Sequence, residues 1–557
     1  MNSAEQTSIT DGFTLAGGKA ALAAGLRAAE TVLATARDRL GARIGEAGAE
    51  ALDAHQFAAH GLAWMATNVE ALRQTLAWVD RLAAAGRLGE LESLIAQAAF
   101  GEYLSQILGG IPLSQGEIVR PADLGLDRRD LAPFDAPGPR ALMQGGNTIG
   151  VRRRIAQLVA DGQFGDWGLD DVTHDLVREQ FHRFADERIA PYANGWHLEN
   201  ALIPDALIGE MAGLGVFGLT IAEEYGGLDM GRIALCIVTE ELSRGYLGVG
   251  SLPTRTEIAA ELIRNSGTED QKSRFLPGIA SGAIIPTASF TEPDAGSDLG
   301  SISTRATLDG DVYRITGAKT WVTHGARSDL MTLLVRTNPD RPGWRGLSMM
   351  LAVKPRGSAT DPFPAAGMSG SEIEVLGYRG MREYEIAFDG FKVDSRNLLG
   401  GAEGEGFKQL MQTFETARIQ TAARANGVAQ NALELALTYA QERRQFSKPI
   451  AEFDRIAGRI GWMAVEIMVS RQLAFFAARL KDQGRRCDAE AGMAKLFAAR
   501  TAWSAADAAV QIFGGNGYAL EFPVSRLLVD ARILNIFEGA AEIQAHVIAR
   551  ALLAERN

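Results

Sequence analysis

The spacing of apolar residues changes twice along this chain, and the order of these changes restricts its possible folds. Up to about residue 283, apolar residues recur every three or four positions, as in amphipathic helices. Between 284 and 400, short β-branched runs alternate with turns, and from 401 onward the helical spacing returns. Strands and helices are therefore grouped, which argues against a doubly wound parallel sheet. The order predicts an α+β fold that is mainly helical.

We expect four regions, because 557 residues are too many for a single hydrophobic core. Residues 1–165 should form a helical N-terminal extension that includes a proline-rich linker from Ile111 to Arg140. A helical domain is expected over 166–283 and a β domain over 284–400. A C-terminal helical bundle is expected over 401–557.

Within the extension, apolar stripes predict individual helices. The stripes run from Leu22 to Leu40, from Phe57 to Val79 and from Leu91 to Leu108. The third helix should stop at Gly109-Gly110, since glycine commonly follows the end of a helix. A further helix is expected from Ala141 to Asp161. Together these helices would make a small bundle in front of the rest of the chain.

Composition and charge argue against several classes of function. The formal net charge of -12 argues against a nucleic-acid partner. Two cysteines, Cys236 and Cys487, give no disulfide framework, and the seven histidines are scattered, so we expect no metal site. The start, MNSAEQTSITDG, contains no basic residue, and we find no apolar run long enough to span a bilayer. We therefore expect a cytoplasmic protein without membrane insertion.

The segment around Glu538 contains a candidate catalytic base. Ile536 and Phe537 precede this carboxylate and Gly539 follows it. Apolar neighbours would desolvate the carboxylate and raise its pKa, and such a base suits removal of a weakly acidic C–H proton. Glycine would let a substrate pass close to the backbone. A carboxylate is also common at the start of a helix, where it stabilises the helix dipole, and both interpretations stay open at this point.

Two further segments suit a flat cofactor that carries phosphates. Ser289 to Asp298 form a Gly- and Pro-punctuated loop after an expected strand, and its N–H groups and hydroxyls could hold a diphosphate. Trp321 and Thr323 lie two residues apart on another expected strand and would point to the same face. The indole could stack on a heteroaromatic ring while the hydroxyl bonds to it. An ordinary turn and a packed sheet core are the alternatives.

Taken together, these segments resemble the acyl-CoA dehydrogenases, flavoenzymes that desaturate acyl-CoA thioesters. The resemblance runs in order from about residue 169 to 557. It implies an N-terminal helical domain, a central β-barrel or sandwich and a C-terminal four-helix bundle, here preceded by an extra helical extension. Six motifs carry it: Glu223-Glu224-Tyr225-Gly226-Gly227, Thr291-Glu292-Pro293 with Ala295-Gly296-Ser297-Asp298, Trp321-Val322-Thr323, Glu442-Arg443-Arg444-Gln445-Phe446, Gln511-Ile512-Phe513-Gly514-Gly515-Asn516-Gly517-Tyr518, and Phe537-Glu538-Gly539.

The resemblance implies FAD as the cofactor and assigns residues to it. The flavin ring and pyrophosphate would contact five residues: Phe290, Thr291, Ser297, Trp321 and Thr323. The adenine half would lie across a subunit interface against four others: Arg443, Phe446, Gln511 and Gly515. A cofactor site shared in this way implies a homo-oligomer, either a dimer or a tetramer.

The resemblance also implies the catalytic roles. Glu538 would remove the α-proton of the thioester, with Gly539 beside the substrate and Arg418 near the thioester and CoA. Some relatives carry their base on another helix, at a position that corresponds to Ala417 here. Glu538 is therefore the only candidate base.

Arg255 is the residue that bears on the choice of substrate. It follows Pro253 in a segment that aligns with the helix at the far end of the acyl pocket in the family, and we expect it in the first turn after this proline. A guanidinium there would bind a carboxylate at the end of a short acyl chain. An arginine turned outward to solvent would have no such role.

Arg255 and the long extension point to a bacterial enzyme that oxidises a short, branched acyl-CoA ending in a carboxylate. The resemblance implies that its electrons pass to electron-transferring flavoprotein. Three alternatives stay open: a dehydrogenase of another short or branched acyl-CoA, an acyl-CoA oxidase, and a non-catalytic scaffold of the same fold.

Overall fold

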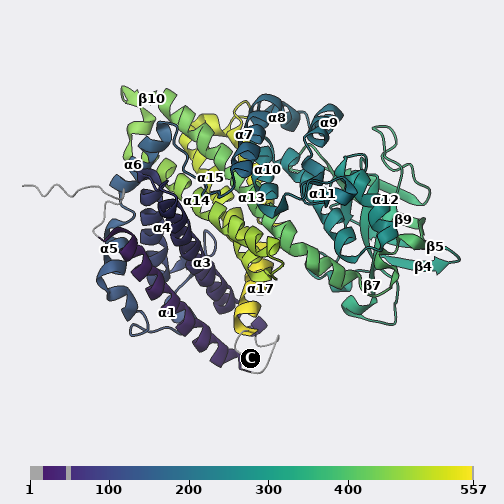
Figure 1. Cartoon of the computed structure of the whole chain (residues 1–557), viewed down its shortest axis with the longest axis horizontal. Coiled ribbons are helices and arrows are strands. Elements are labelled where there is room, and N and C mark those ends of the chain that lie inside the picture. Colours follow the sequence, from purple (N-terminus) through teal and green to yellow (C-terminus); the bar gives the residue numbers. More distant parts are fainter. Residues whose placement is uncertain (1–16, 46–51, 555–557) are drawn as a thin grey trace, which may run out of the picture.

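The structure is a computed structural model that describes residues 17–45 and 52–554. The polar start of the chain, on which the expectation of no targeting segment rests, lies outside these ranges. Helices occupy the left and centre of Figure 1, and the strands labelled β4, β5, β7 and β9 lie at its right. Because helices come first, strands follow and helices return, the prediction of a mainly helical α+β fold is confirmed.

The extension is a bundle of helices, as predicted. Its three apolar stripes are confirmed as α1, α3 and α4, and the third helix does end at Gly109. The linker after it contains a small antiparallel pair of strands, β1 (Ile111–Pro112) and β2 (Ile118–Val119). The helices of the extension are α1 (Gly18–Ile44), α3 (Gln56–Ala84), α4 (Glu90–Gly109), α5 (Pro137–Gly145) and α6 (Ile149–Ala160).

The prediction of one helix over 141–161 is wrong, because α5 and α6 are separate helices. The chain passes close to α4 between them: a Cβ on Gly146 would lie 2.7 Å from the carbonyl oxygen of Gln97. Thr148 then caps α6, since its hydroxyl accepts a hydrogen bond from the Val151 N–H. A glycine required by close packing and a capping residue thus end one helix and start the next.

A second helical region follows the connection at residues 161–171. It comprises α7 (Val172–Phe184), α8 (Ala190–Leu198), α9 (Asp205–Gly213), α10 (Gly231–Gly245), α11 (Leu247–Ser266) and α12 (Glu269–Ala280). Thr268 and Gln271 form a capping box at the start of α12. The helix α11 runs to the β region and packs against β3, so it connects the two kinds of structure.

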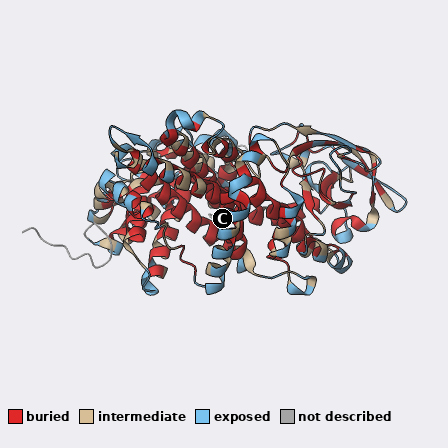
Figure 2. Cartoon of the chain, turned by 90° about the horizontal axis from the view of Figure 1, so that it is seen from above, coloured by how far each residue is buried: buried red, intermediate tan, exposed pale blue. Residues whose placement is uncertain are grey.

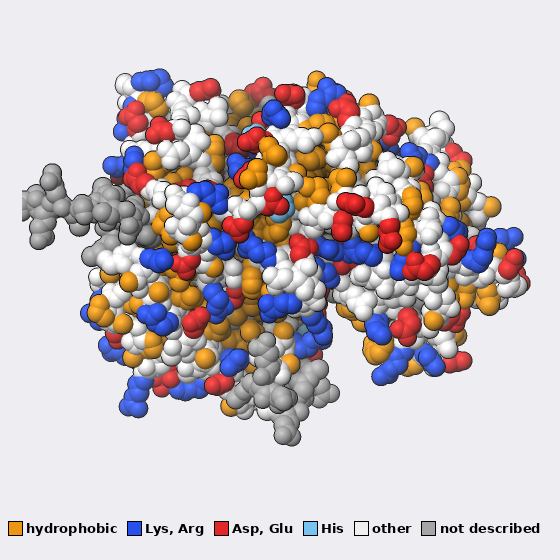
Figure 3. All heavy atoms as spheres, viewed as in Figure 1, with side chains coloured by type: hydrophobic (Ala, Val, Ile, Leu, Met, Phe, Trp, Pro, Cys, Tyr) orange, Lys and Arg blue, Asp and Glu red, His pale blue; other side chains and the backbone are white. Residues whose placement is uncertain are grey.

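The strands form one mixed seven-stranded sheet, with the order β3-β6-β4-β5-β9-β8 and with β7 paired to β6. The strand β3 runs parallel to β6, and β4 and β5 are antiparallel. In the space-filling view the lower outline is notched between this region and the helical body (Figure 3). The strands are β3 (Pro286–Ser289), β4 (Arg305–Asp309), β5 (Val312–Lys319), β6 (Leu330–Arg336), β7 (Leu347–Val353), β8 (Met368–Ile373) and β9 (Glu383–Asp394).

The C-terminal helices form the centre of the molecule. The longest helix, α13, packs against α10, α14 and α15. A short hairpin of β10 (Arg444–Gln445) and β11 (Lys448–Pro449) joins α13 to α14. The helices are α13 (Gly406–Glu442), α14 (Asp454–Asp482), α15 (Asp488–Phe513), α16 (Val524–Ile533) and α17 (Ala541–Ala554).

One hydrophobic core joins the extension to these central helices. Buried side chains of α1, α3 and α4 belong to the same cluster as those of α13, α14 and α15. In Figure 2 the buried residues run through the helical layers without interruption. The extension is therefore packed into the fold and does not form a separate lobe.

The helix α14 qualifies by length and composition as a candidate membrane span, which corrects the expectation that no such run exists. However, 83% of its most apolar window is buried inside the structure. The helices α3, α4 and α6 of the extension pack on it, and so do α13 and α15. Its apolar character therefore serves packing between helices.

Trp167 holds the connection between the extension and the rest of the chain. Its ring lies between two guanidinium groups, 4.4 Å from that of Arg178 and 4.1 Å from that of Arg471. The indole N–H of Trp78 in the extension donates to the carbonyl of Asp166 at 2.9 Å. The two sides of the connection are thus fixed to each other.

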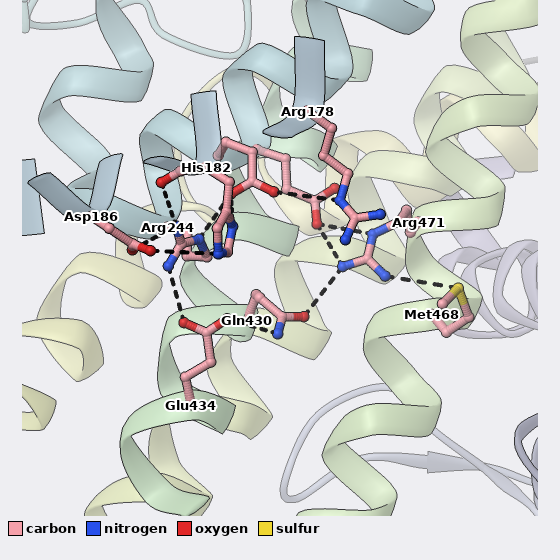
Figure 4. Close-up of polar contacts among 10 residues, drawn as sticks. Arg178, His182, Asp186, Arg244, Gln430, Glu434, Met468 and Arg471 are labelled. Atoms are coloured by element: carbon pink, nitrogen blue, oxygen red, sulfur yellow. Dashed lines mark hydrogen bonds and ion pairs between the residues drawn. The ribbon is translucent and has the colours of Figure 1, made fainter. Parts of the chain in front are cut away.

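A buried network of charges ties α7, α10, α13 and α14 together (Figure 4). Arg244 of α10 pairs with Asp186 at 2.8 Å and with Glu434 of α13 at 3.2 Å. Arg471 of α14 pairs with Glu240 of α10 at 2.7 Å. Breaking a buried pair leaves an uncompensated charge, so these contacts fix how the helices pack. The helix α13 also carries part of the site described next.

Candidate active site

Glu538 lies in the turn between α16 and α17, where its backbone is left-handed with φ 53°, followed by Gly539 with φ 88°. Its carboxylate faces α11 and α13. The Arg255 Nη2 lies 3.0 Å from Oε1, while Arg424 and Thr421 both donate to Oε2. Since its partners are side chains of other helices, the carboxylate is not a cap of α17. Glu538 is thus the centre of a polar cluster built from distant segments.

Burial and charge act on the Glu538 pKa in opposite directions. Burial raises it, as the sequence predicts, but the guanidinium groups of Arg424 and Arg255, together with the Thr421 hydroxyl and the Lys495 ammonium, lower it by more. The prediction of a raised pKa is therefore wrong for the free chain. The reason is that the predicted dry surroundings contain two cations, and Ile536 is itself 51% exposed.

Arg255 is buried, so the alternative of an arginine turned to solvent is wrong. The helix α11 begins at Leu247 and includes Pro253, so Arg255 lies in the turn that follows this proline, as expected, and in the third turn of the helix. Its Nη2 also donates to the Tyr378 hydroxyl at 3.3 Å. Arg255 thus points into the cluster around Glu538.

Arg424 is a site residue that sequence reasoning missed. It is fully buried, its Nη1 donates to Ser251 Oγ at 3.0 Å, and its guanidinium lies 4.8 Å from the Phe537 ring. Its signal was available: a lone charge stands among alanines in the apolar stretch Ala422-Ala423-Arg424-Ala425. A buried charge in such a stretch requires a partner, and here the partner is Glu538.

Lys495 and Gln544 hold the turn that carries Glu538, and both were missed. The Lys495 Nζ donates to the Gly539 carbonyl at 2.6 Å, and the Gln544 side chain donates to the Glu538 carbonyl at 3.1 Å. Burial lowers the pKa of Lys495 to about 7, partly offset by the charge of Glu538. These hydrogen bonds to the carbonyls of the turn thus fix the backbone of the candidate base.

Glu383 is a second carboxyl group of the site and was also missed. Thr323 Oγ1 donates to its Oε2 at 2.9 Å. Burial raises the pKa of Glu383 to about 8, although Arg255 opposes this shift. The only sequence signal was a glutamate at the start of an alternating strand. Thr323 is thereby linked to the cluster of Arg255 and Glu538.

The structure brings Phe290, Thr291 and Trp321 together. The Thr320 N–H donates to the Thr291 carbonyl at 3.0 Å, and the Lys319 Nζ donates to the Phe290 carbonyl at 2.9 Å. A buried ion pair of Lys319 with Glu292, 2.9 Å long, also fixes this loop.

The expected strand through Trp321 and Thr323 is wrong, because β5 ends at Lys319. Trp321 has φ 57° and is 54% exposed, whereas Thr323 is buried, so the two do not share one face. Ser297 lies exposed on the neighbouring loop. An accessible indole beside a polar loop fits an aromatic cofactor that carries phosphates.

The residues expected to hold the adenine half of the cofactor lie on the surface. The Phe446 side chain is 88% exposed on the β10–β11 hairpin. Arg443, Gln511 and Gly515 are exposed as well. None of these four residues forms a hydrogen bond or ion pair with Glu538.

Arg418 is buried on α13 but contacts Asp488, with 3.5 Å between its Nη1 and Oδ1. It makes no ion pair with Glu538. The buried side chain of Ala417, at the alternative position for a base, carries no acid.

Comparison with known proteins identifies the family of the chain. Family models described as acyl-CoA dehydrogenase N-terminal, middle and C-terminal domains match residues 171–283, 287–391 and 404–553. A (2S)-methylsuccinyl-CoA dehydrogenase of Cereibacter sphaeroides is 58% identical over 533 residues, which is 94% of this chain and 96% of that protein.

Two of the solved structures that share the fold cover about 70% of the chain. One, described as electron transferring flavoprotein of Acidaminococcus fermentans, superposes with a TM-score of 0.66 and 32% identity over 70% of this chain and 99% of that one. The other, a glutaryl-coenzyme A dehydrogenase with glutaryl-CoA, superposes with a TM-score of 0.65 and 33% identity over 69% of this chain and 96% of that one. Because the family models match and one relative is 58% identical over 94% of the chain, we conclude that this chain belongs to the acyl-CoA dehydrogenase family, whose members are flavoproteins.

Proposed function

We propose that this chain oxidises (2S)-methylsuccinyl-CoA to mesaconyl-CoA, with FAD as its cofactor. The observation that carries the proposal is the pair of buried arginines, Arg255 and Arg424, beside the candidate base. A plain fatty-acyl substrate offers no partner for two buried guanidinium groups. A substrate with a second carboxylate would pair with them. The 58% identical relative bears the name of this reaction.

In the proposed reaction Glu538 removes the α-proton of the thioester. A thioester α-proton is a weak acid, so the developing enolate oxygen needs hydrogen-bond donors. Within the described ranges the backbone N–H of Glu538 makes no hydrogen bond, which leaves it available for the thioester carbonyl. The hydrogen bonds from Lys495 and Gln544 to the next two carbonyls hold this N–H in place.

The residues around Trp321 are the proposed place of the flavin ring. FAD, when bound, supplies the acceptor for the hydride that leaves the β-carbon. Trp321 would pack against the ring, while Phe290, Thr291 and Thr323 would fix its position. Ser297 would bind a phosphate. The Glu538 side chain is only 11% exposed, which limits the access of water to its carboxylate.

A second copy of the chain would complete the cofactor site. Arg443, Phe446, Gln511 and Gly515 would then bind the adenine half of the cofactor of the partner subunit. Their exposure in one chain supports this arrangement, because it leaves them accessible to a second copy. We propose a dimer or tetramer, with Arg418 close to CoA.

The proposal includes a cellular setting. Electrons would pass to electron-transferring flavoprotein, and the enzyme would serve the ethylmalonyl-CoA pathway in the cytoplasm of a bacterium. We also propose the division of the chain into an extension, 1–165, and domains over 166–283, 284–400 and 401–557.

An anaerobic titration of the purified flavoprotein with a panel of acyl-CoAs tests the proposal. We expect methylsuccinyl-CoA to bleach the flavin absorbance at about 450 nm rapidly, and butyryl-CoA to bleach it little. Bleaching by butyryl-CoA or isobutyryl-CoA instead would retain the family and exclude the dicarboxylic substrate. Hydrogen peroxide formed in air without an added acceptor would indicate an oxidase. No bleaching by any thioester would favour a scaffold protein.

A further inference from the structure

We propose that the terminal carboxylate of the substrate activates the base, by taking the place of Glu538 as the partner of Arg255 and Arg424. The inference rests on the proposed function and adds to it how the site distinguishes a dicarboxylic thioester from a neutral one. In the free chain the base is held in ion pairs, and a thioester without a second carboxylate would leave it there.

Both carboxylate oxygens of Glu538 are occupied in the free chain. Oε1 accepts from Arg255 at 3.0 Å, and Oε2 accepts from Arg424 and Thr421. A carboxylate whose charge is compensated by two cations and a hydroxyl binds a further proton weakly. The free chain therefore holds its base in a state poorly suited to proton abstraction.

The two arginines depend on Glu538 for their charge balance. Within the described ranges it is the only carboxylate with which Arg255 or Arg424 forms an ion pair. A buried charge without a partner is costly, so Glu538 cannot leave them alone. A second carboxylate from the substrate removes this restriction because it supplies the same charge.

The arginines have other contacts that would hold them in place during the exchange. Arg424 donates to Ser251 at 3.0 Å and to Thr421 at 2.8 Å. Arg255 donates to the Tyr378 hydroxyl at 3.3 Å. The guanidinium groups are thus positioned before the substrate binds, and only their carboxylate partner needs to change.

The electrostatics of Glu538 support the exchange. Burial raises its pKa, and the arginines are the largest causes that lower it. When the substrate carboxylate compensates the arginines, the two largest causes that lower the pKa of Glu538 are offset. Thr421 and Lys495 still lower it, but the effect of burial gains weight and the base becomes stronger. The proton then moves from the α-carbon to Glu538, and its electron pair stays in the thioester enolate. This step needs no further reactant.

Exchange of the α-proton with D2O tests the inference, because it reports on the base without net oxidation. Two thioesters are compared at saturation under anaerobic conditions: methylsuccinyl-CoA and 2-methylbutyryl-CoA, in which methyl replaces the carboxylate. We expect exchange of methylsuccinyl-CoA to be faster by about tenfold or more, since one unit in the pKa of the base corresponds to a factor of ten. Its acid limb should also lie at higher pH, where the released base protonates.

A variant adds a result that loss of structure cannot mimic. Arg255→Met should slow the exchange of methylsuccinyl-CoA and at the same time accelerate that of 2-methylbutyryl-CoA, because part of the pairing is gone. Arg264→Met is the matched control: this arginine lies on the same helix and pairs with Glu261. It should change neither rate.

The outcomes separate the two proposals. Equal saturating rates and equal pH profiles for the two thioesters in the unmodified enzyme overturn the inference, and this comparison holds even if the variant does not fold. Equal slowing of both thioesters by Arg255→Met also overturns it. Absence of exchange with every thioester overturns the proposed function itself, and the inference with it.

Discussion

Arg255 Nη2 lies 3.0 Å from Glu538 Oε1 although the two residues are 283 positions apart. One comes from a helix of the second region and the other from a turn near the end of the chain. The arginine proposed to bind the substrate and the candidate base are therefore parts of one charge cluster. Changes on either side of it should affect both binding and catalysis.

Replacement of Arg255 by methionine should raise the KM for methylsuccinyl-CoA by about a hundredfold or more, since removing one partner of a buried charge pair costs about 3–5 kcal/mol. Steady-state kinetics with an artificial electron acceptor measure the change. The KM for butyryl-CoA serves as the reference and should not rise. An unchanged KM for methylsuccinyl-CoA would remove Arg255 from carboxylate binding.

Lys495→Met should lower kcat and leave KM nearly unchanged, because the ammonium contacts the Gly539 carbonyl and not the proposed substrate. The variant also tests a pH effect on stability. The pKa of Lys495 is lowered from 10.5 to about 7, so the unfolded chain binds more protons between these values and stability rises with pH there. Denaturant unfolding at several pH values should show a smaller rise in the variant. An equal rise would contradict this assignment.

Glu383→Gln should remove an effect of pH on stability whose sign is opposite to that of Lys495. Burial raises the pKa of Glu383 from 4.5 to about 8, so the folded chain binds the extra proton and stability falls as pH rises through this window. Glutamine resembles the protonated acid. The variant should match the unmodified protein in acid and be more stable than it above pH 8. Thermal unfolding of both proteins, measured from acid pH to above pH 8, tests this expectation.

Gly539→Ala should abolish most activity, because a Cβ there would lie 2.0 Å from Gln544 Nε2 and the residue has φ 88°. The matched control is Gly484→Ala, which has φ 69° and open space around the added atom. Both variants carry the backbone strain of about 1–2 kcal/mol, so both melting temperatures should fall. Only Gly539→Ala should lose α-proton exchange.

Phe446→Ser should weaken flavin retention and subunit association without destabilising a single chain, because its side chain is 88% exposed there. Flavin absorbance relative to protein absorbance, together with sedimentation, measures both effects. Leu308→Ser on β4, at a side chain 53% exposed, is a control that should change neither. Flavin retained in full by the Phe446 variant would argue against a shared site.

Local sequence patterns were sufficient to predict several helices and to recognise single motifs. The stripes of α1, α3 and α4 follow from helical spacing alone, and Glu538 is marked by its flanks. Arg424 and Lys495 could not be assigned, because their partners lie in distant segments and only packing brings them together. The Glu538 pKa was misjudged for the same reason: apolar neighbours in sequence do not reveal cations that arrive from other helices.

The shared core of the extension and α14 has a consequence for protein quality control. A chain made without its first 165 residues would expose a helix that resembles a membrane span in length and composition. Chaperones and proteases recognise such surfaces. We therefore expect the three domains that the family models match to depend on the extension for stable folding in this protein.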